Sequence, residues 1–239
     1  MSLSGLPAIG PTLVSARSFE EYLAMFNLDD ADLTGRVLDC PGGAASFAAE
    51  AGACGVDVLA VDPVYAADHT WLGEHGKSEA LRGNRHTASC LDAFSWTFFT
   101  DIDDHRRRRL QAACVFADDL AQRPERYLAA ALPQLPLADR SIDLVLSSHL
   151  LFMYADRLDA AFHAAAAAEM LRVTRREVRI FPLVADSGEP VEHLIEAVVE
   201  VATARGASAE REPSRYEFQR GGDELLILTP PTSVDVQGL

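Results

Sequence analysis

The chain lacks any apolar run approaching the ~18 consecutive residues that a membrane-spanning helix needs. Its first residues, Met1 to Gly10, contain no basic segment followed by an apolar stretch, which is the pattern of a secretory signal. We therefore expect a soluble protein of the cytoplasm that has no membrane partner.

Basic side chains are also scarce. The sequence has 21 Lys and Arg against 36 Asp and Glu, a formal net charge of −15, and Lys77 is its only lysine. Proteins that bind phosphate backbones need a positive surface, so nucleic acid is not an expected partner. One basic run, His105 to Arg109, follows Asp101, Asp103 and Asp104, and runs of this kind usually form a solvated helix face.

Cysteines are few and far apart. Cys40, Cys54, Cys90 and Cys114 show no spacing typical of a metal site or a redox motif, and a chain of this length does not need disulfides to be stable. We predict four buried thiols and no metal site.

The apolar content, in contrast, is high. Hydrophobic residues make up 49% of 239 residues, which is enough to bury a core, and this length suits one α/β domain. No repeat of about 20 to 50 residues is visible, which excludes a solenoid.

The clearest pattern is a strand, a glycine turn, a helix and a second strand. Arg36 to Cys40 is a short apolar run that stops at Pro41-Gly42-Gly43, and an alanine-rich helix is expected from there to Gly55. Val56 to Asp62 then reads as a strand closed by Pro63. This order, within about 30 residues, is typical of a βαβ unit and predicts a parallel sheet.

The rest of the chain continues the alternation. Further strands are expected at 127–130, 141–147 and 177–182, and helices at 158–173 and 191–202. Residues 1–35 are expected to form a helical cap, and residues 66–125 a helical insertion or lid within the same single domain. The runs 215–218 and 223–229, joined by a glycine turn, predict an antiparallel hairpin at the edge of the sheet.

Ligands of open parallel sheets bind at the carboxyl ends of the strands, so the turns after Cys40 and Asp62 should converge on one small molecule. Gly42 and Gly43 allow the backbone to approach a ligand closely, and Asp62 can accept two hydrogen bonds from a ribose diol.

The first turn lacks the third glycine of the G-x-G-x-x-G motif that holds a pyrophosphate, because Asp39 to Ala45 contains only two adjacent glycines. A nicotinamide dinucleotide is therefore disfavoured. An adenosyl cofactor with a sulfonium suits an acidic turn better, since Asp39 can attract the cation directly or through water. S-adenosyl-L-methionine is the natural candidate.

These features resemble the class I S-adenosylmethionine-dependent methyltransferases. The resemblance runs from about Arg36 to Thr229 and rests on the turn after Asp39, Asp62, the Leu135-Pro136-Leu137 loop, Asp143 and the closing hairpin. It implies an α/β fold with a Rossmann-like, doubly wound, mostly parallel sheet of seven strands and a C-terminal antiparallel hairpin strand. Four shorter motifs resemble a bacterial branch of the superfamily whose methyl acceptor is undefined: 18–23, 94–96, 147–152 and 216–222.

Carried over position by position, Asp39 and Gly43 match the acidic start and the middle glycine of the family motif, whereas its other glycines are Pro41 and Ala45 here. The family's acidic residue after the third strand falls at Ala131, so the adenine would be held by the backbone, at Leu132, and by apolar packing. The expected cofactor-binding residues are Asp39, Pro41, Gly42, Gly43, Asp62, Pro63, Leu132 and Ser147.

His149 lies just past the fourth strand, where members of the superfamily often place groups that face the substrate. It is our candidate base, and Tyr154 is a weaker candidate; a buried structural histidine is the alternative. The expected activity is methyl transfer to an undefined small-molecule acceptor. A non-catalytic adenosyl-binding or interaction module, and an NAD-dependent enzyme, stay open as alternatives.

Overall fold

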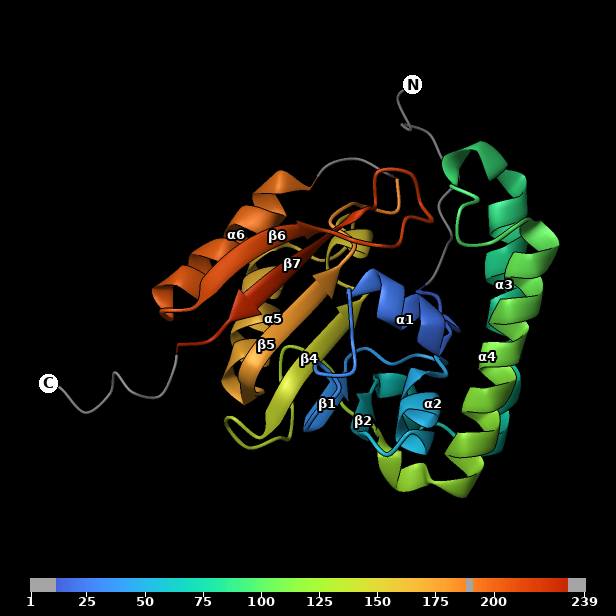
Figure 1. The fold of residues 1–239 in the computed structure, drawn as a ribbon, viewed down its shortest axis with the longest axis horizontal. Helices are drawn as coiled ribbons and strands as arrows, with labels where there is room; N and C mark the ends of the chain where they lie inside the picture. Colours follow the sequence, from blue (N-terminus) through green and yellow to red (C-terminus); the bar gives the residue numbers. More distant parts are fainter. Residues whose placement is uncertain (1–11, 188–190, 232–239) are drawn as a thin grey trace, which may run out of the picture.

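The computed structural model describes residues 12–187 and 191–231 of the 239-residue chain. In the described part, a seven-stranded sheet has the order β3-β2-β1-β4-β5-β7-β6 (Figure 1). The strands are β1 Arg36–Asp39, β2 Asp57–Val61, β3 Tyr127–Leu128, β4 Ile142–Ser148, β5 Thr174–Phe181, β6 Ser208–Pro213 and β7 Glu224–Thr229. The first five run parallel, and β7 is antiparallel to both β5 and β6. This confirms the expected Rossmann-like, mostly parallel sheet of seven strands with a C-terminal antiparallel hairpin strand.

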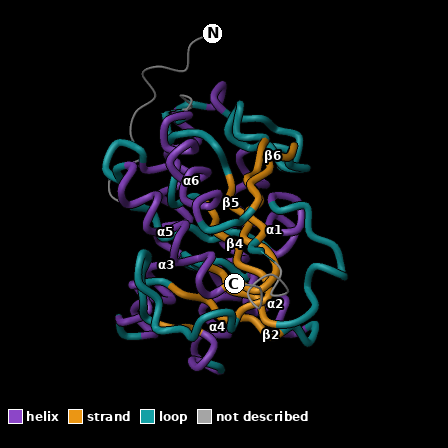
Figure 2. The backbone as a smooth tube through the Cα atoms, turned by 90° about the vertical axis from the view of Figure 1, so that its left-hand side faces the viewer, coloured by secondary structure: helices purple, strands orange, loops and turns teal. Residues whose placement is uncertain are grey.

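Helices cover both faces of the sheet. They are α1 Phe19–Met25, α2 Phe47–Ala53, α3 His69–Ser89, α4 Ile102–Gln122, α5 Ala160–Val173 and α6 Glu192–Ala204, with 3-10 turns η1 Pro63–Ala66, η2 Leu91–Ala93, η3 Pro124–Arg126 and η4 Phe152–Tyr154. Figure 2 shows α5 and α6 on one side of the strands and α1 and α2 on the other. Each side has its own hydrophobic core cluster.

Local sequence signals explain where several helices begin and which face they bury. The Ser18 side chain accepts a hydrogen bond from the Glu21 N–H and the Glu21 side chain accepts one from the Ser18 N–H, a capping box that starts α1. Helix α6 buries Leu194, Ile195, Val198 and Ala202, the apolar face expected from their spacing.

Two helices of 21 residues each, α3 and α4, fill most of the segment between β2 and β3. They lie side by side at the right of Figure 1. Glycine makes this packing close, because a Cβ added at Gly73 would lie 2.9 Å from the Cβ of Ala117 on α4. A Cβ at Gly76 would lie 2.8 Å from the Cβ of Ala44, in the turn after β1. The pair is therefore held tightly against the carboxyl end of the sheet.

The expected hairpin is present, but its first strand is Ser208–Pro213 and not 215–218. Tyr216 and Phe218 belong to the connection between β6 and β7, where their rings are buried. Phe98 lies 5.0 Å from Tyr216, and Phe99 lies 5.0 Å from Phe218, between ring centroids. The aromatic run was wrongly assigned to a strand because tertiary packing, not strand pairing, buries it.

The prediction of four buried thiols is wrong for two of them. Cys40 is buried and Cys90 is intermediate, but Cys54 and Cys114 are exposed. Cys54 caps the end of α2, and Cys114 lies on a solvent-facing position of α4. The spacing of cysteines in the sequence therefore does not indicate whether each thiol is buried.

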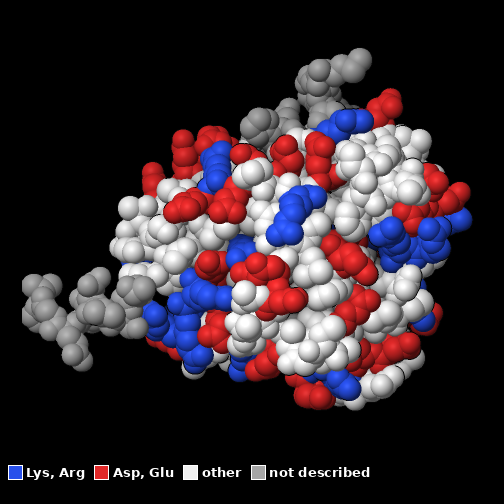
Figure 3. Space-filling model, viewed as in Figure 1, with Lys and Arg blue, Asp and Glu red and all other residues white. Residues whose placement is uncertain are grey.

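Charged groups of both signs are interspersed on the face of the molecule seen in Figure 3, where the basic side chains form small groups among acidic ones. Within residues 12–187 and 191–231, no helix has both the length and the apolarity to cross a bilayer.

Candidate functional site

A cavity of about 160 Å³, here called the strand-end cavity, opens at the carboxyl ends of β1, β2, β3 and β4. Its walls come from the turns after these strands, from the segment that precedes α1 and from α5. They comprise Thr12, Leu13, Ser15, Cys40, Pro41, Gly43, Val61, Asp62, Pro63, Ala130, Ala131, Leu132, Ser148, His149, Leu150, Tyr154 and Phe162. This is where an open parallel sheet is expected to bind a ligand.

A second cavity of about 110 Å³, here called the helical cavity, lies between α3, α4, the segment before α1 and the connection between β6 and β7. Leu13, Ser15, His149 and Tyr154 line both cavities, so the two adjoin. A molecule in each would meet at these four residues.

Asp62 follows β2 and lines the strand-end cavity. Its Oδ2 accepts a hydrogen bond from the Gly43 N–H at 3.0 Å, and its Oδ1 accepts one from the Val64 N–H at 3.0 Å. A carboxylate has about four lone-pair positions, so these two bonds leave about two unused. Burial raises the pKa of Asp62, and the N–H groups of Val64 and Gly43 oppose the rise.

Asp39, in contrast, does not line the strand-end cavity. It is 1% exposed, and both of its carboxylate oxygens lie within hydrogen-bond distance of the Tyr22 hydroxyl, at 3.0 and 3.2 Å. Burial raises the pKa of Asp39 well above its usual range. The expected role of Asp39 in attracting the ligand is therefore wrong, because its carboxylate faces the Tyr22 hydroxyl and does not line the cavity.

The backbone N–H groups of the turn after β1 are already used within the protein. Those of Gly42, Ala44 and Ser46 donate to Val61, Ser15 and Arg17 carbonyls, at 3.0, 3.0 and 2.9 Å. That of Gly43 donates to Asp62, and that of Ala45 donates to the Gly42 carbonyl. Dinucleotide folds hold a pyrophosphate with free N–H groups at this place, so the turn is unsuited to one.

The two glycines of the turn have different roles. Gly43 lines the strand-end cavity in the left-handed region, with φ of 52°. Gly42 does not line it; a Cβ there would lie 2.4 Å from the Tyr65 hydroxyl, so glycine is required for packing. Of the other expected cofactor residues, Pro41, Pro63 and Leu132 line the cavity.

The expected contact from Ser147 falls one residue too early. Ser147 is buried and does not line the strand-end cavity, whereas Ser148 does. Successive side chains of a strand point to opposite faces, so a shift of one residue moves the side chain away from the site.

His149 lies at the junction of the two cavities in an uncommon backbone conformation, with φ of 54°. Its N–H donates to the Phe181 carbonyl at 2.7 Å, and its Nδ1 lies 2.8 Å from the Ser148 hydroxyl. Burial, then Arg17 and Arg109, lower the pKa of His149 well below 6.5. The imidazole is therefore uncharged at neutral pH.

Tyr154 stands beside His149 at the same junction, and its hydroxyl accepts a hydrogen bond from the Leu13 N–H at 3.0 Å. Burial raises the pKa of Tyr154. Its hydroxyl is thus protonated, and it fastens the segment before α1 over the cavities.

Sequence analysis missed the charged cluster of the helical cavity. Arg109 and His105 are buried, so this part of the basic run is not the solvated helix face that we expected, although Arg106 and Arg107 are exposed. Arg109 donates to Glu21, 88 positions earlier in the chain, at 2.9 Å. Arg17 also lines the helical cavity. No short motif marks these residues, because their partners are distant in sequence.

Within the described ranges, no group of three or more His, Cys, Asp and Glu side chains is arranged to hold a metal ion.

No family model matches the chain. Its sequence is 28% identical over 218 residues to the uncharacterised protein MJ0045 of Methanocaldococcus jannaschii, which covers 91% of this chain and 96% of that protein. This relative is archaeal.

Two solved structures are similar in fold. One is the magnesium protoporphyrin IX methyltransferase of Synechocystis with bound SAM, 12% identical, with a TM-score of 0.48 over 89% of this chain and 78% of that one. The other is the 1,6-didemethyltoxoflavin-N1-methyltransferase of Burkholderia thailandensis with bound 1,6-didemethyltoxoflavin and S-adenosylhomocysteine, 12% identical, with a TM-score of 0.43 over 90% of this chain and 87% of that one.

Proposed function

We propose that the protein is an S-adenosyl-L-methionine-dependent methyltransferase, with the cofactor in the strand-end cavity and a small-molecule acceptor in the helical cavity. The observation that carries this proposal is the pair of adjoining cavities at the carboxyl ends of the strands, with His149 at their junction. Two substrates that must exchange a group need such a pair.

The residues of the strand-end cavity fit the cofactor. Asp62 offers two free lone pairs to a ribose diol, and Ala130, Ala131, Leu132 and Phe162 supply an apolar wall for an adenine ring. Held there by Asp62 and this apolar wall, the cofactor would supply a sulfonium methyl group for in-line displacement by the acceptor, with S-adenosylhomocysteine as the leaving group. The chain's own work is to align the acceptor and to exclude water.

His149 is the group available to take a proton from the acceptor, if the acceptor must lose one. Its imidazole is neutral and lies at the junction of the cavities. Tyr154 closes the same junction from the side of Leu13. A pure binding module would need no uncharged base at this place, and a dinucleotide enzyme would need free N–H groups in the turn after β1.

The first test is calorimetric titration with S-adenosylhomocysteine. We expect saturable binding to the wild type and a loss of about 1.5–3 kcal/mol in Asp62→Ala, the range for hydrogen bonds to a charged group. Asp57→Ala is the matched control, because Asp57 is exposed at the opposite end of the same strand. Equal binding by Asp62→Ala, or saturable binding of NAD, would contradict the proposal.

A second arm tests turnover. The wild type, incubated with methyl-labelled cofactor and a panel of small acceptors, is expected to transfer label, and His149→Gln to transfer it about 100-fold more slowly with unchanged S-adenosylhomocysteine affinity. Binding without transfer to any acceptor would favour the non-catalytic module.

The bacterial origin and the cytoplasmic location remain predictions.

A further inference from the structure

We propose that the acceptor carries a carboxylate, and that the guanidinium of Arg17 binds this group in the helical cavity. The inference rests on the proposed function, since it assigns the substrate class of the second cavity.

Arg17 is almost buried and has donors to spare. Its side chain is 11% exposed and lines the helical cavity, and its carbonyl accepts the Ser46 N–H at 2.9 Å, which fixes the backbone. Its Nε and Nη1 are buried and make no hydrogen bond with any part of the chain that the structure describes. Buried donors without partners cost free energy, so the arrangement favours a ligand that accepts from them.

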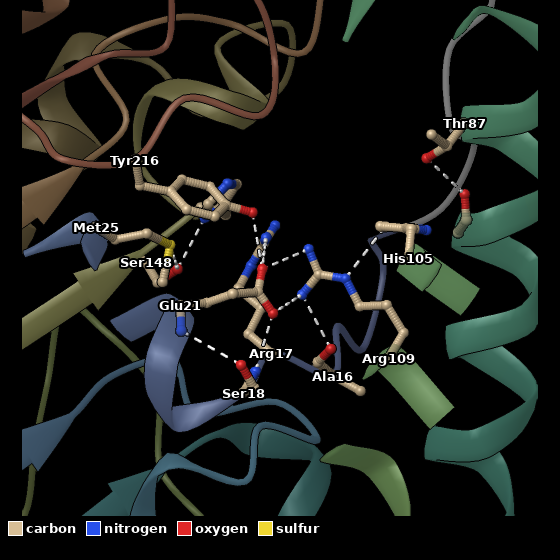
Figure 4. A network of polar contacts seen from close by, with 12 residues as sticks. Ala16, Arg17, Ser18, Glu21, Met25, Thr87, His105, Arg109, Ser148 and Tyr216 are labelled. Atoms are coloured by element: carbon tan, nitrogen blue, oxygen red, sulfur yellow. Dashed lines mark hydrogen bonds and ion pairs between the residues drawn. The ribbon is translucent and has the colours of Figure 1, made fainter. Parts of the chain in front are cut away.

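Glu21 forms an ion pair with Arg17 but accepts no hydrogen bond from its Nε or Nη1, because other donors already saturate the carboxylate. Glu21 accepts from both terminal nitrogens of Arg109, at 2.8 and 2.9 Å, from the Tyr216 hydroxyl at 2.7 Å and from the Ser18 N–H at 3.0 Å (Figure 4). These donors fill its roughly four lone-pair positions. Arg17 Nη1 stands 3.7 Å away, beyond hydrogen-bond distance.

The cluster therefore has one positive charge in excess. Two guanidiniums face a single carboxylate, which is 0% exposed. Glu79 also lines the helical cavity, but Arg82 binds it at 2.6 Å. Because the two buried guanidiniums share one counter-ion, burying the second charge is costly, and an anionic ligand would balance it.

The remaining walls indicate what the anion is attached to. Leu13, Ala80, Phe94, Met153 and Phe218 line the helical cavity with apolar atoms. Asp186 in the same walls is acidic and would repel a dianion more strongly than a monoanion, which favours a carboxylate over a phosphate. The acceptor class is thus a small carboxylic acid with an apolar or aromatic body.

The test uses benzoate as the probe and benzamide as its neutral analogue, each titrated by NMR into the full-length protein saturated with S-adenosylhomocysteine. We expect benzoate to bind the wild type at least tenfold more tightly than benzamide, and Arg17→Met to lose at least tenfold in benzoate affinity alone. Arg17→Lys, which keeps the charge but not the planar fork, should lie between the two.

Arg106→Met is the matched control, because Arg106 is an exposed arginine of α4, 53% exposed and paired with Asp103. It should bind benzoate like the wild type. Equal affinities for benzoate and benzamide, no benzoate binding at all, or full benzoate binding by a folded Arg17→Met would each overturn the proposal. S-adenosylhomocysteine affinity, measured first on every variant, separates these results from a failure of the cofactor site.

Discussion

At the scale of single residues, the surroundings of His149 determine its charge. Burial is the largest cause of its lowered pKa, and Arg17 and Arg109 add to it because a second positive charge beside them is unfavourable. An anion bound to Arg17 would offset part of this effect and raise the pKa of His149 toward its usual value. The acceptor would then make the imidazole a better proton acceptor on arrival.

This gives a prediction for the titration of His149. In the wild-type protein its NMR signals should show no protonation step near 6.5, the usual value. In Arg17→Met the pKa should rise, because one of the two nearby positive charges is gone. The signals are assigned with His149→Gln, and Arg106→Met should leave the titration unchanged. A wild-type protonation step near 6.5 would show that the imidazole is solvated. It would contradict the lowered pKa that we assign to His149.

At the scale of elements, the segment 12–17 forms hydrogen bonds with two other parts of the site. Its carbonyls at Ser15 and Arg17 accept the N–H groups of Ala44 and Ser46, and the Ala16 carbonyl accepts from Arg109 at 3.0 Å. The same segment thus connects the turn after β1 with α4. A shift of the turn would move the walls of both cavities.

Two glycines allow this coupling to be measured. Gly43 and Gly55 both have positive φ, 52° and 89°, so alanine should cost about 1–2 kcal/mol of stability at either position. A Cβ at Gly43 would also lie 3.0 Å from the Ser15 carbonyl oxygen, whereas one at Gly55 would meet no atom within 4 Å. We expect Gly43→Ala to weaken S-adenosylhomocysteine binding about tenfold and Gly55→Ala to leave it unchanged, by calorimetry. Equal affinities in the two variants would argue against coupling between the turn and the segment.

At the scale of the whole molecule, the sequence predicts the sheet better than it predicts the site. The unit β1-α2-β2 is recognisable because its strands are short apolar runs and its turn contains glycines, all signals within about 30 residues. The expected site residue was Ser147, the last residue of the predicted strand 141–147. Sequence places a strand end only to within a residue, and that residue decides which side chain faces the cavity. Arg17 and Arg109 could not be found, because their burial depends on Glu21 and on contacts that Arg109 makes with residues about 90 positions earlier.

Histidine burial also links the stability of the whole fold to pH. Burial, then Arg109 and Arg17, lower the pKa of His105 to about 2, and Arg109 Nε donates to its Nε2 at 3.2 Å. In the unfolded chain this histidine regains a pKa near 6.5, so below that pH the unfolded state binds a proton that the folded state does not. The free energy of unfolding therefore loses up to about 1.4 kcal/mol per pH unit from this residue as the pH falls from its unfolded pKa toward its folded one. Buried Asp39 and Asp62 act in the opposite direction, because raised carboxyl pKa values let the folded state bind protons first.

Since these contributions overlap, the prediction concerns a difference between variants. Denaturant unfolding at a series of pH values between about 4 and 7 gives the slope of the free energy of unfolding against pH. For His105→Gln we expect this slope to be lower than the wild-type slope by up to about 1.4 kcal/mol per pH unit. Gly55→Ala lowers stability without changing a titratable group. It should therefore lower the denaturant midpoint at every pH and keep the wild-type slope against pH. If His105→Gln kept the full wild-type slope, His105 would be protonated in the folded state. The helical cavity would then carry one more positive charge than we infer.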